Sequence, residues 1–164
     1  MALLPILRYP DVRLSQQALP VTSFDAALQR LAGDLLQTMR AAPGVGITAS
    51  HVGISQRIMV LELPEQDPEI YCNPQILSSS PQTIRHAEGS VSMPGVTDEV
   101  ERPAAIRFRY QNLEGMVHEE DADGFHAVCI QHEIDQLDGI FWLKRLSRLK
   151  RERLIRSWQK QSSG

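Results

Sequence analysis

The sequence predicts an α+β fold in a single domain that spans residues 1–164. Three observations lead to this fold class. A segment near the start repeats apolar residues at the helical period, short segments in the middle alternate apolar and polar residues, and a later segment is apolar on all sides. A chain of 164 residues can bury one hydrophobic core. The chain has no internal repeat, low-complexity block or linker that would indicate a second domain.

Composition and charge exclude several classes of protein. Hydrophobic residues make up 42% of the chain and charged residues 23%, which is typical of a soluble globular protein. A net charge of −3 gives no overall attraction to nucleic acid or membrane, so we expect no binding to free DNA. The sequence has no apolar stretch of about 18 residues, so we expect no membrane span. Its start lacks a basic region followed by an apolar run, so we expect no signal peptide. Its two cysteines, Cys72 and Cys129, form no disulfide framework, and a cytoplasmic protein with free thiols is the simplest expectation.

The chain begins with a proline-containing stretch, 1–21, that predicts an extended arm. A helix is expected over residues 24–42, where apolar side chains recur at steps of three and four. Thr22 or Ser23 can cap this helix, and Asp25 suits the positive end of its dipole. A Pro-Gly pair directly afterwards ends it.

Short β-prone segments follow in the middle of the chain. Strands are expected over 57–63 and over 69–77, with the second one broken by an Asn-Pro pair at Asn73. Residues 104–112 alternate apolar and polar side chains, which predicts a half-buried strand, and 116–120 is its expected hairpin partner. The short connections favour antiparallel pairing.

Two helices are expected in the last third of the chain. Residues 124–137 are apolar all round, which is typical of a buried helix, and Gly139 ends it. The tail predicts a basic helix over about 144–160. That stretch holds eight lysine and arginine residues and one glutamate, a sum of +7.

The buried helix carries an incomplete metal-hydrolase motif. His132 and Glu133 form the start of a His-Glu-x-x-His pattern, but Gln136 stands at its fifth position. One interpretation is a metal site in which Glu133 takes a proton from bound water. The other is that His132 is an ordinary core histidine and Glu133 a structural carboxylate. The segment alone does not separate these two.

Three segments in order resemble the peptide deformylases. This chain has "GVGITASH" at 44–51, "EGSVS" at 88–92 and "QHEIDQ" at 131–136. The family carries Gly-x-Gly-x-Ala-Ala-x-Gln, Glu-Gly-Cys-Leu-Ser and Gln-His-Glu-x-Asp-His at matching separations. The opening "ILRYPDVRL" is similar as well, so the resemblance covers nearly the whole chain. It implies antiparallel β-sheets around a buried central helix, with an N-terminal and a C-terminal helix.

The resemblance also implies a reaction, and here the sequence departs from the family. Peptide deformylases remove the formyl group from the N-terminal formylmethionine of a nascent chain, using a metal held by one cysteine and two histidines. His132 is retained, but Ser90 replaces the cysteine and Gln136 the second histidine. Glu133 is retained as the general acid and base. Because a hydroxyl and a carboxamide are poor ligands, we expect no cofactor and little or no deformylase activity, a degenerate enzyme.

The positions that support the oxyanion in the family are partly kept. The main-chain amide of Val91 matches the family, whereas His51 replaces a glutamine. An alternative hypothesis is a divergent deformylase or related amidase, in which His51 and His132, with Glu133 or Ser90, hold Fe²⁺, Zn²⁺ or Ni²⁺ in a rearranged site.

Serine chemistry is a further alternative. Ser90 would be the nucleophile, His51 or His132 the base, and Glu133 or Glu88 the residue that orients it. The sequence has no nucleophile-elbow motif to support this set.

The resemblance implies a peptide-binding cleft even without catalysis. Its matching positions are Val45, Gly46, Gly89, Phe125, Val128 and Cys129. The alternative is that these are only core residues. The expected partners are nascent peptide N-termini and, through the basic C-terminal helix, the ribosome. A plain peptide-binding or ribosome-binding module is therefore another interpretation.

Overall fold

The structure, a computed structural model, describes residues 2–163. Three short 3-10 helices accompany the regular elements: Val12–Ser15, Ala49–Val52 and Trp142–Arg145. The α-helices and strands run in the order α1 (Ala26–Ala41), β1 (Gly46–Thr48), β2 (Ile58–Leu61), β3 (Glu69–Ser79), β4 (Thr83–Glu88), β5 (Asp98–Pro103), β6 (Ala105–Gln111), β7 (Val117–Asp123), α2 (Gly124–Leu137) and α3 (Arg148–Ser163).

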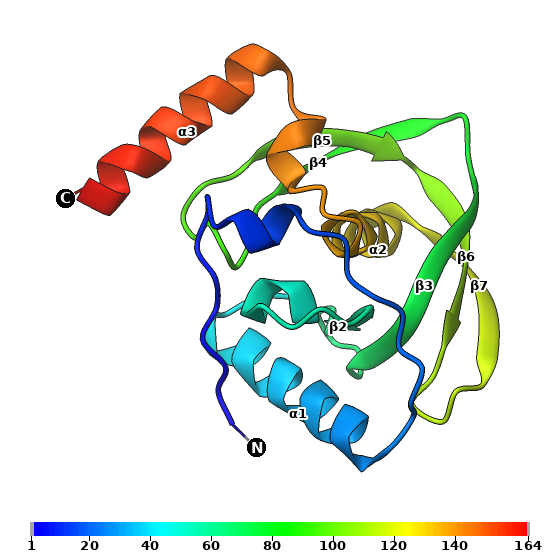
Figure 1. The fold of residues 1–164 in the computed structure, drawn as a ribbon. Helices are drawn as coiled ribbons and strands as arrows, with labels where there is room; N and C mark the ends of the chain where they lie inside the picture. The colour runs from blue at the N-terminus through cyan, green and yellow to red at the C-terminus, as the bar shows by residue number, and fades with distance from the viewer. Residues whose placement is uncertain (1, 164) are drawn as a thin grey trace.

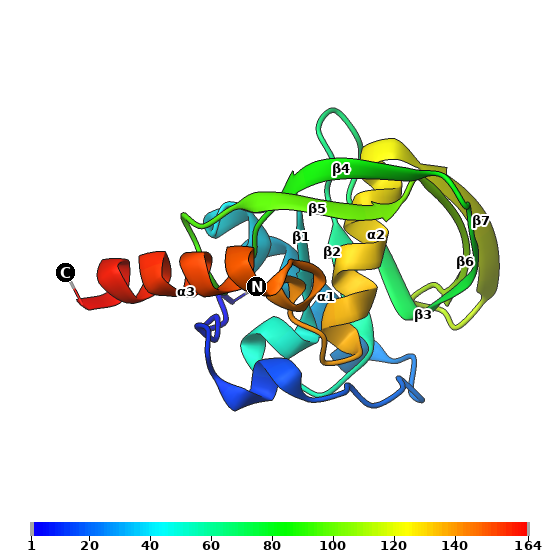
Figure 2. The same cartoon turned by 90° about the horizontal axis from the view of Figure 1, so that it is seen from above.

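The strands form one large antiparallel sheet and one separate hairpin. The large sheet has the order β1-β2-β3-β6-β7, and each neighbouring pair in it is antiparallel. The hairpin β4–β5 lies between β3 and β6 in the sequence, yet β3 and β6 pair with each other. Figure 2 shows this hairpin crossing over α2, opposite the large sheet. The predicted α+β class with antiparallel sheets is confirmed.

Helix α2 occupies the centre of the molecule (Figure 1). It contacts strands of both the large sheet and the hairpin, and ten of its fourteen residues are buried. This explains its low amphipathicity, because a helix that is covered on all sides needs no polar face. The predicted bounds, 124–137, agree with the structure. Helix α1 packs on β1 and β2 and closes the other side of the core.

Two local predictions are corrected at the start of α1 and within β3. Asp25, and not Thr22 or Ser23, caps α1, because its carboxylate accepts a hydrogen bond from the Leu28 amide at 3.0 Å. The Asn-Pro pair at Asn73 does not break β3. A bulge takes up the irregularity, since Asn73 has φ +50° and the register shifts between Cys72 and Gln75.

One pair of strands has no counterpart among the predicted elements, and one helix boundary is corrected. The hairpin β4–β5 was not expected as a pair of strands, because its inward-facing Arg102 hides the usual alternation of apolar and polar residues. The C-terminal helix begins at Arg148, and not near 144, because Lys144 and Arg145 belong to the preceding 3-10 turn.

Helix α3 extends away from the body in both views (Figures 1 and 2). One of its side chains contacts the N-terminal arm. Trp158 anchors it, since this side chain is buried and its indole N–H donates to the Tyr9 carbonyl at 3.0 Å. The Arg8 guanidinium lies 4.9 Å from the centre of the Trp158 ring. Within residues 2–163, none of the helices has the length and apolar character needed to cross a bilayer.

Candidate active site

A cavity of about 610 Å³ lies where the arm, the segment after α1, the loop between β4 and β5, and α2 meet. All six residues predicted to form a peptide-binding cleft line it: Val45, Gly46, Gly89, Phe125, Val128 and Cys129. His51, Ser90, Val91, His132 and Glu133 line it as well. Gln136 is the one predicted site residue that does not. The structure therefore brings together residues up to 88 positions apart, from Val45 to Glu133, although their roles stay predictions.

The glycine-rich segment approaches the neighbouring segments closely. A Cβ atom at Gly44 would lie 2.9 Å from the Val91 side chain. A Cβ atom at Gly46 would overlap the Glu133 carboxylate. Glycine at these two positions lets the main chain pack against the β4–β5 loop and against α2.

His51 is held by a capping interaction in the 3-10 helix Ala49–Val52. Thr48 is the N-cap, and its hydroxyl accepts a hydrogen bond from the His51 amide. In return, the Thr48 amide donates to Nδ1 of His51 at 2.9 Å. The imidazole thus takes the part that glutamate or glutamine has in a capping box.

This hydrogen bond fixes the proton on the His51 ring. A main-chain amide can only donate, so Nδ1 must accept and Nε2 carries the hydrogen. Burial, and then the nearby His132, lower the pKa of His51 to about 3, so the ring is neutral. Nε2 is buried and has no hydrogen-bond partner among the described residues.

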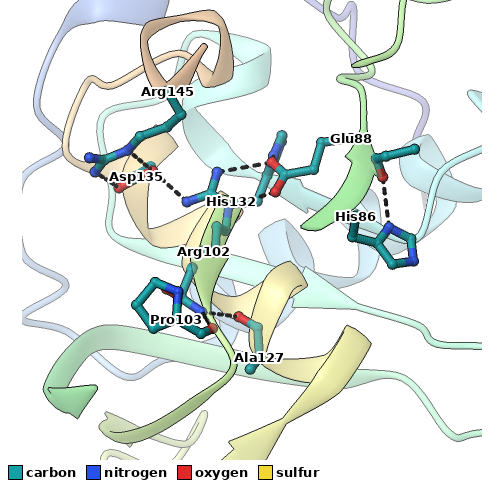
Figure 3. A network of polar contacts seen from close by, with 10 residues as sticks. His86, Glu88, Arg102, Pro103, Ala127, His132, Asp135 and Arg145 are labelled. Carbon is teal, nitrogen blue, oxygen red and sulfur yellow. Dashed lines mark hydrogen bonds and ion pairs between the residues drawn. The ribbon is translucent and has the colours of Figure 1, made fainter. Parts of the chain in front are cut away.

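A buried ionic network supports the other histidine of the cavity (Figure 3). Glu88 accepts a hydrogen bond from Nδ1 of His132 at 2.8 Å. Arg102 donates two hydrogen bonds to Glu88, at 2.6 and 2.9 Å, and one to Asp135 at 2.9 Å. Arg145 adds two more to Asp135, at 2.8 and 2.7 Å. These hydrogen bonds join the β4–β5 hairpin to α2, and α2 to the turn before α3, beside the cavity.

The network determines the charge of Glu88 and His132. Burial alone raises the pKa of Glu88, but the hydrogen bonds from His132 and Arg102 outweigh it and lower the pKa to about 2. Burial lowers the pKa of His132, but Glu133 and Glu88 outweigh this effect and raise it. Glu88 is therefore an anion that orients the His132 ring through Nδ1.

Glu133 lies next to His132 on α2 and is buried. Burial raises its pKa, against the opposing effect of His132. Its Oε1 atom has no hydrogen-bond partner among the described residues. A carboxyl group with a raised pKa and a free oxygen is suited to proton transfer or to binding a ligand.

Ser90 and Gln136 make hydrogen bonds within the protein. The Ser90 hydroxyl accepts from the Ser92 amide at 3.0 Å. Nε2 of Gln136, which is buried, donates to the Leu14 carbonyl at 2.7 Å. Over residues 2–163, no hydrogen bond joins Ser90 to His51 or His132, so the structure does not assemble the predicted serine set. In the same range, no three His, Cys, Asp or Glu side chains lie close enough together to hold a metal ion. His51, His132 and Glu133 therefore do not form such a group.

Comparison with known proteins assigns this chain to a family. The family model described as "Polypeptide deformylase" matches residues 3–152. The chain belongs to the peptide deformylase family. Family members are metal-dependent. The resemblance of the motifs implies that their three ligand positions correspond here to Ser90, His132 and Gln136. These positions offer one hydroxyl, one imidazole and one carboxamide.

Several relatives within the peptide deformylase family are similar along their whole length. A peptide deformylase-like protein of Agrobacterium fabrum is 62% identical over 160 residues, covering 98% of both chains. A peptide deformylase of Phenylobacterium zucineum is 44% identical and covers 98% of this chain and 97% of its own. The solved peptide deformylase of Legionella pneumophila superposes with a TM-score of 0.93 at 35% identity, covering 99% of this chain and 96% of its own. The Ehrlichia chaffeensis enzyme, solved in complex with actinonin, gives 0.93 at 36% identity and 98% of both.

The sequence analysis did not identify the residues that hold side chains of the deformylase-like site in place through hydrogen bonds. Arg102 holds Glu88 and is itself held by Asp135, and the Leu14 carbonyl holds Gln136. The members of these pairs lie 14, 33 and 122 positions apart, and no local spacing links them. Thr48 was also missed. The Thr-x-x-His spacing to His51 is a capping pattern that could have been found from the sequence.

Proposed function

We propose that this chain is a peptide deformylase-like protein with little or no deformylase activity, and that it binds the N-terminal segment of a peptide in the cavity. One observation carries the proposal. The side chains at two of the three ligand positions are a hydroxyl and a carboxamide, and both are used in hydrogen bonds to the main chain. The third, His132, is the single imidazole left of the family's ligand set.

The chemistry of these side chains does not fit the family's metal. Thiolate and imidazole are the ligands that Fe²⁺, Zn²⁺ and Ni²⁺ prefer, whereas a serine hydroxyl and an amide oxygen are neutral and weak. A structural zinc site supplies about 10–16 kcal/mol, so the loss of two of its stronger ligands removes a large share of that free energy. His51 does not replace them in its present tautomer, because its Nε2 carries a proton and its Nδ1 accepts from Thr48.

The cavity supports the second half of the proposal. Strand β1 is an edge strand of the large sheet, and its first residue, Gly46, lines the cavity. A peptide that adds to a sheet edge and places one side chain in a pocket is a common mode of recognition. Phe125, Val128 and Cys129 supply apolar lining of the kind that a methionine side chain requires.

A restored ligand set tests the loss of activity. Removal of formate from formyl-Met-Ala-Ser is compared for the wild type and for the double variant Ser90→Cys, Gln136→His, with metal content measured on both. We expect activity and bound metal only in the variant, because Glu88 and the Leu14 carbonyl remain available to orient the two histidines.

Glu133→Gln in the double variant is the matched control. It should keep the metal and lose the activity, because the general base is removed. Rapid turnover by the wild type, together with one equivalent of bound metal, would disprove the loss of activity. If that metal disappears in His51→Ala, the rearranged site is the correct interpretation.

We also propose that α3 docks on the ribosome. Its side chains Arg153, Arg156 and Lys160 are exposed, and the helix extends away from the body, where a large partner can reach it. Co-sedimentation with ribosomes should weaken steeply as salt rises from about 50 to 200 mM, and should be lost in Arg153→Glu/Arg156→Glu. Arg107→Glu/Arg109→Glu on β6 changes the net charge equally and should bind normally. Equal binding by both variants would contradict this proposal.

A further inference from the structure

Among residues 2–163, Arg8 is the one lysine or arginine that lines the cavity. It lies on the N-terminal arm, and hydrogen bonds fix the main chain on both sides of it. The Leu7 amide donates to the His51 carbonyl at 2.7 Å, and the Tyr9 amide donates to the Ser92 carbonyl at 2.9 Å. Successive side chains of an extended segment point to opposite sides. Leu7 and Tyr9 therefore pack on the core, while Arg8 lines the cavity.

The Arg8 side chain is held in position but has no counter-ion. Its guanidinium lies 4.9 Å from the centre of the Trp158 ring on α3, a cation–π contact. Trp158 is itself fixed by its hydrogen bond to the Tyr9 carbonyl. Within the described part of the chain, no carboxylate forms an ion pair with Arg8 and no other group accepts a hydrogen bond from its guanidinium. This exposed, permanently charged group therefore keeps its N–H donors available where the cavity meets solvent.

The carboxyl groups that line the cavity are buried and lie away from Arg8. Glu88 is occupied by its hydrogen bonds from His132 and Arg102. Arg8 is not among the charged groups that shift the pKa of Glu133. The cavity thus has its carboxyl groups in its buried part and an unpaired cation at its mouth. A peptide whose first residue occupies the buried part must leave the cavity through this mouth, where Arg8 lies.

We propose that Arg8 binds a carboxylate of the peptide beyond its first residue, so that the cavity prefers peptides with an acidic group there. A guanidinium and a carboxylate pair through two parallel hydrogen bonds, which are stronger than those between neutral groups. The contact with Trp158 reduces the side-chain freedom that Arg8 loses on binding. The carboxylate belongs to an aspartate or glutamate side chain or to the C-terminus of a short peptide. This inference rests on the proposed peptide binding and names the chemistry of the peptides that the cavity selects.

Isothermal titration at low ionic strength tests the inference with four peptides. The neutral reference is formyl-Met-Gln-Gln-amide. In formyl-Met-Glu-Gln-amide and formyl-Met-Gln-Glu-amide a side chain carries the carboxylate, and in formyl-Met-Gln-Gln with a free C-terminus the main chain carries it. We expect the wild type to bind at least one acidic peptide about threefold to tenfold more tightly than the reference, and this preference should fall as salt rises. Mass spectrometry checks that the peptides stay intact.

Two variants of Arg8 separate recognition from a structural role. Arg8→Gln should bind all four peptides with the affinity that the wild type has for the neutral reference. Arg8→Glu should bind the acidic peptides more weakly than the reference, because the two carboxylates repel each other. A merely structural role of Arg8 would instead lower the affinity for all four peptides alike. Arg30→Gln on α1 is the matched control, since Arg30 is exposed, does not line the cavity and changes the net charge equally. It should keep the preference.

The outcomes distinguish this inference from the proposed function. If the wild type binds all four peptides equally, or if the preference persists in Arg8→Gln, the inference is wrong while peptide binding stands. Loss of the preference in Arg30→Gln would show that net charge alone is responsible, and it overturns the inference too. If the wild type binds none of the peptides, the proposed peptide binding fails and the inference fails with it. The wild-type comparison decides the matter even where a variant does not fold.

Discussion

Removal of Arg102 should strongly destabilise the protein. Its side chain is 4% exposed and donates three hydrogen bonds to two carboxylates, one of which, Glu88, is equally buried. Removing one partner from a buried ion pair costs about 3–5 kcal/mol, because the remaining charge is left uncompensated. Glu88 keeps its bond from His132, and Asp135 keeps two from Arg145, so we expect the lower end of that range for Arg102→Met.

Urea unfolding followed by circular dichroism measures this loss in the free energy of unfolding. The matched control is Arg85→Met on the same hairpin. Arg85 pairs with Glu101 at 3.3 Å, but both side chains are more than half exposed, so the loss should stay below about 1 kcal/mol. If the two variants lose similar amounts, or if Arg102→Met loses less than about 1 kcal/mol, the network does not hold the hairpin and α2 together as argued.

Three further predictions follow from buried groups. Burial raises the pKa of Cys72 from 9.0 to about 11 and also shields the thiol from reagents. At pH 8 the native thiol should therefore react with iodoacetamide at least a hundredfold more slowly than the same thiol in the unfolded chain, and equal rates would contradict this. Trp158→Ala removes the buried side chain that anchors α3, and it should lower the free energy of unfolding in urea by about 3 kcal/mol. A loss under about 1 kcal/mol would show that other contacts hold α3 in place. Gln136→Met leaves the Leu14 carbonyl without its hydrogen-bond donor and should lower the free energy of unfolding by about 1–3 kcal/mol. Gln136→His keeps an N–H at this position and should lower it by less. The reverse order of stabilities would contradict this role of Gln136.

The sequence predicts those elements whose residues obey one local rule. Helix α2 begins at Gly124, has apolar residues around its whole circumference and ends shortly before Gly139, and its limits agree with the prediction. Strand β6 alternates strictly, and Ile106, Phe108 and Tyr110 are buried on one face as expected. The hairpin β4–β5 follows a different rule. One of its buried side chains, Arg102, is charged, and the carboxylates of Glu88 on the paired strand and of Asp135 on α2 make that burial favourable.

In the candidate site, too, local patterns predict some features, whereas others depend on contacts between distant residues. Except for Gln136, the residues that the motifs assign to the site line one cavity, and their roles stay predictions. Spacing does not give the direction of a side chain. His132 and Gln136 are one helical turn apart, yet His132 lines the cavity while Gln136 reaches the Leu14 carbonyl in the arm. The carbonyl that orients Gln136 lies 122 positions away in sequence, beyond any local pattern.

The replaced positions share one physical property. Ser90 and Gln136 both satisfy main-chain groups, the Ser92 amide and the Leu14 carbonyl, so neither side chain leaves a buried main-chain group unpaired. His51 satisfies the Thr48 amide in the same way, but its second ring nitrogen stays unpaired. Each of the three side chains therefore pairs with a main-chain group of this fold, which explains how the fold accommodates residues that differ from the family's motifs.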